Sequence, residues 1–198
     1  MSRSSIPSVF LGAAALALTL ACGGGGGGGG TTSTPPPSAT KLVYTDPSAG
    51  AYQLKKNATL STNTHLVLDL VGDGSTTGAG LAFSLSVDTT RVTGWTKVAA
   101  ADAFLVENGT VLNLGAGTPI MKSTTAAAGG TQTLSAAVAQ KGFAGSVALN
   151  GPLARVAVDL KNGAMPGSIT LTVVKASVLN SAGTIASAAV TAGSLSAQ

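Results

Sequence analysis

Residues Leu81–Asp88 read LAFSLSVD and alternate strictly between apolar and polar or small side chains. Leu81, Phe83, Leu85 and Val87 fall on one side of an extended chain, and the residues between them fall on the other. A helix would scatter these apolar residues around its axis. The stretch therefore predicts a β-strand with one face in a core and the other face outside it.

The same period recurs along the chain. The clearest further stretches are 65–71, 154–160 and 169–173, and the weaker ones are 42–45, 92–98, 110–114, 134–139, 146–149, 174–179 and 185–195. Turn signals lie between them at Asp73-Gly74, Asn108-Gly109, Asn150-Gly151-Pro152, Asn162-Gly163, Pro166-Gly167 and 180–183. Residues 99–106 have room for one or two helical turns. About nine strands with one-sided alternation predict an all-β fold, an antiparallel β-sandwich.

The charge content is low and dispersed. The 198-residue chain has 9% charged residues and a formal net charge of +4. Its basic residues stand singly except for Lys55-Lys56, so no stripe forms that could follow a phosphate backbone. The composition argues against nucleic-acid binding.

The first 21 residues have the organisation of a secretory signal peptide. A short polar segment carrying Arg3 is followed by an uncharged apolar run, 9–21. A membrane-spanning helix needs about 20 apolar residues, and this run is shorter. It is followed by eight glycines, which disfavour helix continuation. Residues 1–21 are therefore expected to direct export rather than to span a membrane.

Cys22 is the only cysteine, and the segment that ends in it, Thr19-Leu20-Ala21-Cys22, resembles the lipobox of bacterial lipoproteins. That resemblance implies that Cys22 is the lipid attachment site. The sequence departs from the family pattern at Thr19, where leucine is usual. The alternative is ordinary cleavage after Ala21, which would leave a free N-terminal thiol. An unpaired thiol is a reactive liability in an oxidising compartment, and this favours lipidation.

Residues 22–40 are expected to form the lipidated cysteine and its tether, with residues 41–198 forming one domain. The tether holds glycine, serine, threonine and proline with no charge, and it cannot bury a core. Gly23, rather than aspartate, follows the cysteine, and by resemblance to lipoprotein sorting this favours the outer membrane. The domain would then face the periplasm or the cell surface.

The order of the strand segments resembles a cohesin-like module. The residues that carry the resemblance are 66–71, 79–88, Arg91-Val92, 153–160, 166–173 and 180–183. The opening Lys41–Pro47 is similar to that of uncharacterised bacterial lipoproteins with this pattern. The resemblance implies a jelly-roll sandwich related to carbohydrate-binding modules, on the receptor side of a pairing with dockerins. A generic immunoglobulin-like sandwich is the alternative.

No catalytic arrangement stands out among the titratable residues. His65 is the only histidine, and no G-x-S-x-G elbow supplies a nucleophile for it. One histidine and one cysteine do not make a zinc site. Asp69 and Asp73 offer too few oxygens for calcium, and Asp73-Gly74 fits a tight hairpin turn better. The seven acids are dispersed, so we expect no enzyme and no cofactor.

Sugar binding would need an exposed aromatic platform. The domain has six aromatic residues, of which Trp95 and Tyr52 are the candidates for ligand contact, although core packing is the stronger interpretation of Trp95. The sequence thus predicts a membrane-anchored, non-catalytic module that recognises a protein partner at the cell envelope. Polysaccharide binding by the same sandwich is the alternative. An envelope enzyme that uses dispersed acids is a third possibility, and it would require two carboxylates converging in a pocket.

Overall fold

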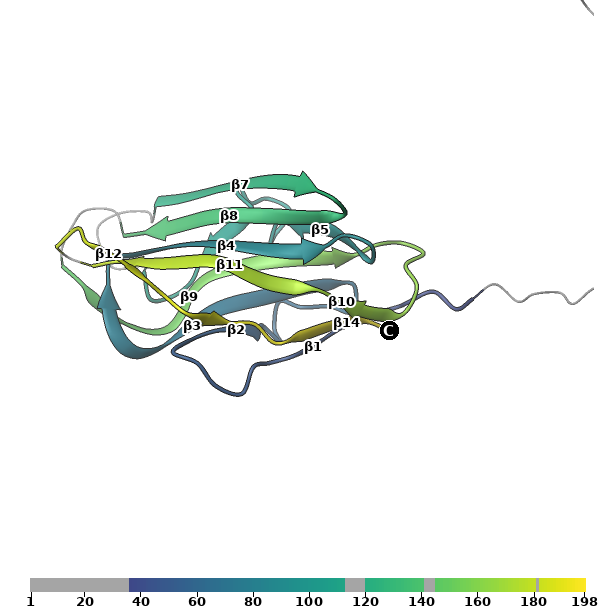
Figure 1. Ribbon diagram of the computed structural model, residues 1–198, viewed down its shortest axis with the longest axis horizontal. Coiled ribbons are helices and arrows are strands. Elements are labelled where there is room, and N and C mark those ends of the chain that lie inside the picture. The colour runs from purple at the N-terminus through teal and green to yellow at the C-terminus, as the bar shows by residue number, and fades with distance from the viewer. Residues whose placement is uncertain (1–35, 113–119, 141–144, 181) are drawn as a thin grey trace, which may run out of the picture. The chain divides into compact units, whose positions relative to one another are not determined.

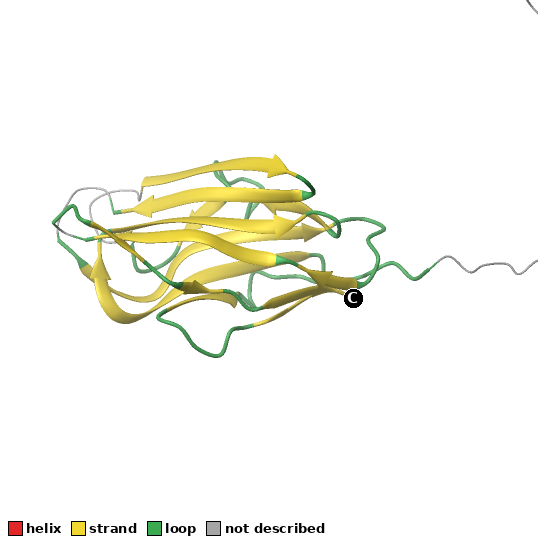
Figure 2. Cartoon of the chain, viewed as in Figure 1, coloured by secondary structure: helices red, strands yellow, loops and turns green. Residues whose placement is uncertain are grey.

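Residues 36–112, 120–140, 145–180 and 182–198 are described by the structure, a computed structural model, and within them the secondary structure is entirely strand and loop (Figure 2). No helix in this part of the chain is long and apolar enough to cross a membrane. Cys22, the expected signal peptide and residues 22–35 of the expected tether lie outside the described residues.

The strands form two main sheets and one small one (Figure 1). The five-stranded sheet has the order β12 (Ile185–Ser187), β11 (Leu171–Leu179), β4 (Gly80–Asp88), β8 (Thr131–Ala139) and β7 (Ile120–Ala128). The six-stranded sheet has the order β13 (Val190–Thr191), β2 (Tyr52–Lys56), β3 (His65–Gly78), β9 (Val147–Leu160) and β5 (Val92–Thr96), with β6 (Val106–Asn108) also paired to β9. The three-stranded sheet has the order β1 (Leu42–Thr45), β14 (Ser194–Ala197) and β10 (Gly167–Ile169). Every pairing is antiparallel except β13 with β2. The all-β sandwich is confirmed.

The alternation in Leu81–Asp88 sets the inner face of β4. Leu81, Phe83, Leu85 and Val87 are all at most 3% exposed. They share one apolar cluster with Leu66, Leu68 and Leu70 of β3, in the other main sheet. Burying such a leucine or valine contributes roughly 1.5–3 kcal/mol relative to exposure. The rows from the two sheets therefore form the centre of the core.

Two of the predicted turns are bulges inside long strands. Asp73-Gly74 lies within β3 and Asn150-Gly151 within β9, and the two segments face each other in the register. Gly74 and Gly151 both have positive φ, 84° and 111°. The glycines thus supply left-handed residues that bend a continuous strand pair, where the sequence pattern had predicted chain reversals.

The run 169–173 belongs to two sheets rather than to one strand. Gly167–Ile169 pairs with β14 in the small sheet, whereas the chain from Leu171 pairs with β4. The break falls at Thr170, whose carbonyl accepts a hydrogen bond of 2.9 Å from the Asp88 amide. The stretch 185–195 is likewise divided, into β12, β13 and β14. Such divisions contribute to the difference between the fourteen strands of the described residues and the nine or so expected.

Three local predictions differ from the structure. Residues 99–106 form turns and then β6 instead of helix, because Asp102 closes a turn by accepting the Ala99 amide at 2.8 Å. Residues 110–112 form a turn rather than a strand, and 113–114 lie outside the described residues. The strand pattern did not predict β2 or β7. In β7 no residue falls in the buried class, so no apolar alternation marks it.

The chain enters and leaves the sandwich at adjacent points. The Thr40 and Lys41 amides donate to the Gln198 carbonyl at 2.6 and 2.9 Å. Ala39 is buried, and its amide donates to Ala164 at 2.7 Å. Ordered contacts therefore begin slightly before Lys41.

Tyr44 joins three segments near this end. Its buried hydroxyl donates to the Leu54 carbonyl at 2.9 Å and accepts the Gly193 amide at 2.6 Å. Gly193 has no room for a side chain, since a Cβ there would lie 1.9 Å from the Thr45 carbonyl oxygen. Burial raises the pKa of Tyr44 to about 12, against a lowering by the hydrogen bond from Gly193, and the charge of Asp46 adds to the increase.

We expect Tyr44→Phe to lower the free energy of unfolding by about 1–2 kcal/mol at neutral pH, because it removes both hydrogen bonds. The folded pKa lies above the unfolded value of 10. The stabilisation by Tyr44 is therefore complete below pH 10 and is lost as the pH rises towards 12. Urea unfolding of both proteins from pH 7 to 11.5 should show their difference shrinking above pH 10, and a constant difference would contradict this account.

Candidate binding face

The two aromatic residues proposed for ligand contact are both buried. Trp95 is 4% exposed and Tyr52 is 5% exposed, so neither forms the exposed platform that the sugar-binding alternative required. The Trp95 indole Nε1 donates to the Gln132 carbonyl at 3.0 Å, which ties β5 to β8 across the two main sheets. Tyr52 hydrogen-bonds to the Thr76 hydroxyl. Neither side chain is exposed where the sugar-binding alternative requires it, and Trp95 packs in the core, as the stronger interpretation of its sequence position expects.

A bulge at Gly94 explains the position of Trp95. The register of β5 with β9 shifts between Val92 and Trp95, and Gly94 has a φ of 108°. A Cβ on Gly94 would lie 2.3 Å from the Gln132 side-chain oxygen, which accepts the Trp95 amide at 2.6 Å. The glycine thus makes room for the glutamine that holds the tryptophan.

His65 and Asp159 connect a strand pair to the following loop. The His65 Nδ1 and an Asp159 carboxylate oxygen are 2.5 Å apart, and the His65 Nε2 lies 3.1 Å from the Val98 carbonyl. Both ring nitrogens are therefore occupied by structural contacts. The histidine links β3, β9 and the segment that follows β5.

All seven carboxylates of the chain have local hydrogen-bond partners. The two exposed turn residues illustrate this: hydrogen bonds from Ser75 lower the pKa of Asp73, and hydrogen bonds from Thr90 lower the pKa of Asp88. Asp46 accepts the Lys56 amide, and Asp102 accepts the Ala99 amide. Asp69 accepts the side chains of Arg155 and Asn57, and Glu107 also accepts Arg155. Asp159 pairs with the ring of His65. Among the described residues, no group of three His, Cys, Asp or Glu is placed to hold a metal ion.

The outer face of the six-stranded sheet carries an ion-pair network. Arg155 contacts Asp69 at 2.9 Å and Glu107 at 3.2 Å, and Asn57 donates to the second Asp69 oxygen at 2.9 Å. Burial lowers the pKa of Arg155, but the hydrogen bond that it donates to Glu107 and the charge of Asp69 outweigh this effect, and the pKa rises.

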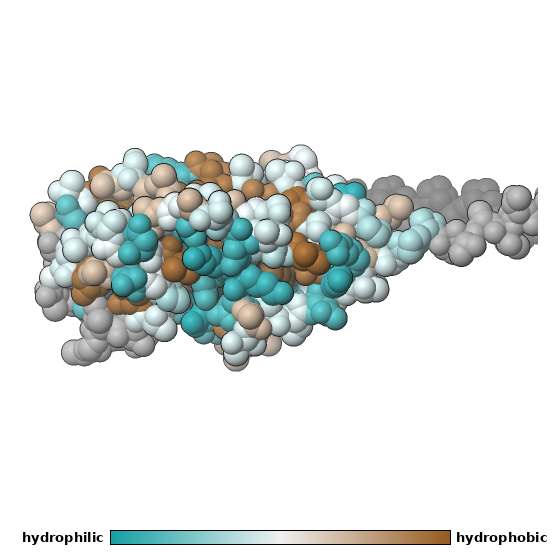
Figure 3. Space-filling model, turned by 90° about the horizontal axis from the view of Figure 1, so that it is seen from below, coloured by the Kyte–Doolittle hydropathy of each residue, from teal (hydrophilic) through white to brown (hydrophobic). Residues whose placement is uncertain are grey.

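The same outer face is largely covered. Val67, which points outward between two core leucines of β3, is 0% exposed, and its neighbour Ala157 on β9 is 1% exposed. The Ser61 hydroxyl contacts both the amide and the carbonyl of Val67. Hydrophilic residues also gather along the side of the domain seen from below (Figure 3).

The outer face of the five-stranded sheet is open and consists of small side chains. The register aligns Ala82 with Ala137, and Ser84 with Ser135. We call this surface the small-residue face; it comprises Ala82, Ser84, Ser86, Thr133, Ser135, Ala137, Lys175, Ser177, Lys122 and Thr124. All ten side chains are exposed or half-buried. Its only charges are two lysines, with Asp88 at the end of β4.

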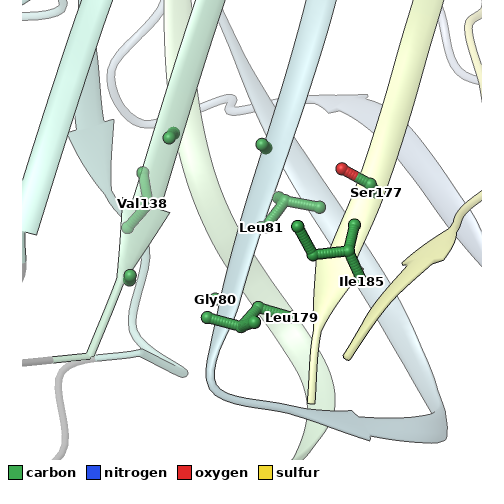
Figure 4. A pocket seen from close by; sticks show the side chains of 9 residues that line it. Gly80, Leu81, Val138, Ser177, Leu179 and Ile185 are labelled. Atoms are coloured by element: carbon green, nitrogen blue, oxygen red, sulfur yellow. The ribbon is translucent and has the colours of Figure 1, made fainter. Parts of the chain in front are cut away.

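Shallow hollows lie along this face. One, where β4 begins and β11 ends, is lined by apolar and small residues that include Gly80, Ala137, Leu179 and Ile185 (Figure 4). Two more follow towards the middle, beside Lys122 and Lys175. Gly80 leaves little room for a side chain beside β8, since a Cβ there would lie 3.0 Å from the Ala139 Cβ. Ile185 is 71% exposed at its rim.

Sequence reasoning did not identify the small-residue face, although the strand pattern contained a signal for it. The alternation that buries Leu81–Val87 also places Ala82, Ser84 and Ser86 on the opposite side. What could not be read from the sequence was which strands lie next to β4, and therefore that small residues line up across four strands. That information is in the register.

We expect Asp69→Asn to lower the free energy of unfolding by about 1–3 kcal/mol, because it leaves the Arg155 guanidinium with one fewer charged partner in a half-buried position. The matched control is Asp73→Asn, at an exposed turn, where the amide oxygen can still accept the Ser75 amide and the change should stay within about 0.5 kcal/mol. Urea unfolding measures both. Equal effects of the two substitutions would show that the network does not stabilise the domain.

Comparison with solved structures supports a cohesin-like sandwich. One match is a chain from a type II cohesin–X–dockerin complex of Acetivibrio cellulolyticus, with a TM-score of 0.53, 11% identity, and coverage of 73% of this chain and 95% of that one. A type II cohesin domain from the cellulosome of the same organism gives a TM-score of 0.53 at 11% identity, covering 74% and 94% of the two chains. No protein-family model matches the sequence, and neither does any curated protein. The fold of this domain is therefore a cohesin-like, all-β sandwich.

Proposed function

We propose that this chain is a membrane-anchored, non-catalytic binding module whose small-residue face recognises a protein partner. The observation that carries the proposal is the difference between the two outer faces of the sandwich. One is covered by loop contacts and an ion-pair network, while the other presents a broad surface that no described segment covers.

The chemistry of the small-residue face fits a protein surface. Alanine, serine and threonine side chains allow the backbone of a partner to approach closely, and their hydroxyls can pair with polar groups of the partner. Lys122 and Lys175 favour acidic groups opposite them. The hollow beside Leu179 and Ile185 offers a place for one apolar anchor residue.

The cohesin-like fold supports the same function, since one matched structure is a complex between a cohesin and a dockerin-containing chain. The distribution of acids supports a non-catalytic role. The enzyme alternative needs two carboxylates converging in a pocket, and no acid lines the hollows described above. The sugar-binding alternative needs exposed aromatic side chains, and both of its candidates are buried in the core.

The anchor remains part of the proposal. Residues 1–21 would act as the signal peptide, Cys22 would carry the lipid, and 22–40 would connect it to the domain that begins near residue 41. Two or three acyl chains would hold the protein at the membrane, whereas one chain gives only marginal binding. We propose the bacterial outer membrane as its location, with Gly23 after the cysteine as the supporting feature.

A photo-cross-linking amino acid at Ser135, in the centre of the small-residue face, should capture a discrete protein in intact cells. The same probe at Lys56, exposed on the six-stranded sheet, is the matched control and should not capture that protein. Adding Ala137→Glu should reduce the Ser135 cross-link at least tenfold, because it places a carboxylate in the hollow. Normal unfolding of the variant would show that folding is unaffected.

Two results would count against this role. Equal capture from Ser135 and Lys56 would mean that the face has no specific partner. Retention of the protein on insoluble glycan, unaffected by Ala137→Glu and without a protein cross-link, would favour the polysaccharide alternative.

Lipidation can be tested separately at Cys22. Radioactive palmitate should label the wild-type chain, and Cys22→Ser should lose the label and move from the membrane to the soluble fraction. Thr19→Leu, which restores the usual lipobox residue, should keep the label and speed processing. Label that survives Cys22→Ser would overturn the assignment.

A further inference from the structure

The strand β7 forms one edge of the five-stranded sheet. It pairs with β8 over its whole length of nine residues. No backbone hydrogen bond joins its other edge to any residue that the structure describes. The Leu105 amide donates to the Ser123 hydroxyl of β7 at 3.0 Å, and Ser123 pairs with the buried Ala136, so this contact lies on the inner side of the sheet.

This edge differs from the other sheet edges of the domain. β12, β13 and β10 are two or three residues long, β1 has four, and β5 has five with a bulge at Gly94. Short or bulged edges are ways in which proteins avoid pairing with another chain. β7 is long, has a regular register with β8, and carries one charge, Lys122. An edge of this kind is a template for an added strand.

We propose that the free edge of β7 pairs antiparallel with β7 of a second copy of this chain, with Thr124 on the two-fold axis. In an antiparallel pair, directly opposed residues point to the same face, so the axis must pass through a residue rather than between two. A two-fold axis at Thr124 pairs all nine residues of β7 with the second copy, whereas an axis at any other residue of the strand leaves some of them unpaired. The two five-stranded sheets would then join into one continuous sheet.

The side chains of β7 suit this arrangement. Its first three residues, Ile120, Met121 and Lys122, are large, and its last three, 126–128, are alanines. The two-fold places each large residue opposite an alanine of the other copy, and Thr124 opposite Thr124. Threonine pairs of this kind stabilise antiparallel sheets.

The charges are also compatible with a second copy. Each lysine of the pair faces Ala126 of the partner, and the two lysines stand four residues apart along the strands. At about 3.4 Å per residue this separates them by roughly 14 Å, which exceeds the Debye length of about 8 Å at physiological salt. The repulsion that a lysine normally adds to an edge strand is therefore weak in this register.

Cysteine cross-linking tests the register in the full chain. With Thr124→Cys, the opposed Cα atoms would be about 4.5 or 5.5 Å apart, inside the roughly 4.4–6.8 Å over which a disulfide joins two Cα atoms. We expect a disulfide-linked dimer on mild oxidation in cells. Thr172→Cys, exposed on β11 away from the edge, is the matched control, and the unmodified chain measures any background from Cys22. A dimer from Thr124→Cys no stronger than from these controls would overturn the proposal.

A charge exchange tests the register through its charges, with the same disulfide-linked dimer as the readout. Added to Thr124→Cys, Ala126→Lys would oppose Lys122 of the partner twice, and we expect at least a tenfold loss of dimer. Adding Lys122→Glu as well would place opposite charges together and should restore the dimer. Failure of this rescue would exclude the Thr124-centred register. Because the test does not involve the partner of the small-residue face, it can fail while the proposed function stands.

Discussion

The packing of β4 on β3 is the interaction from which the other features of the domain follow. Leu81, Phe83, Leu85 and Val87 meet a row of leucines from the other main sheet in a single core. Because side chains alternate along a strand, this burial forces the residues between them to point away from the core. The core of the five-stranded sheet and its open outer face are thus two results of one sequence pattern.

The strand β3 obeys a different constraint. Its residues 66–70 are buried on both sides, so the sheet that contains it needs a second cover. The loop around Ser61 and the network of Arg155 with Asp69 and Glu107 provide contacts there. The half-buried arginine lies between two carboxylates, and its desolvation offsets much of its attraction to them. The network therefore orders the contacts on this side of the sheet more than it adds to the net free energy of folding. The sandwich therefore has one closed side and one open side.

Alternation predicted the sandwich and the buried face of β4, but it could not predict the elements in which glycine or neighbouring strands intervene. Gly74 and Gly151 signal turns in isolation, yet facing each other they bend a strand pair. Gly94 shifts the register so that Trp95 turns inward. The strand β7 has no buried face, and its run of serine, threonine and alanine carries no periodic signal. The small-residue face depends on the register between strands, a tertiary property that one sequence does not display.

The symmetry proposed for β7, taken together with the proposed lipid anchor, bears on how two copies would lie on one membrane. A two-fold axis through Thr124 runs perpendicular to the sheet, so it reverses the strand direction and places the two chain entry points, each beside Gln198 of its copy, at opposite ends of the joined sheet. If both copies carry the proposed lipid anchor, the two anchors reach one membrane surface equivalently when the axis is normal to it, with the joined sheet lying flat. The proposed tether, residues 22–40, would extend by roughly 60 Å at most from each entry point. The two small-residue faces then point the same way, either towards the lipid or away from it. When they point away from it, they offer a partner one continuous surface, twice as wide as that of either copy alone.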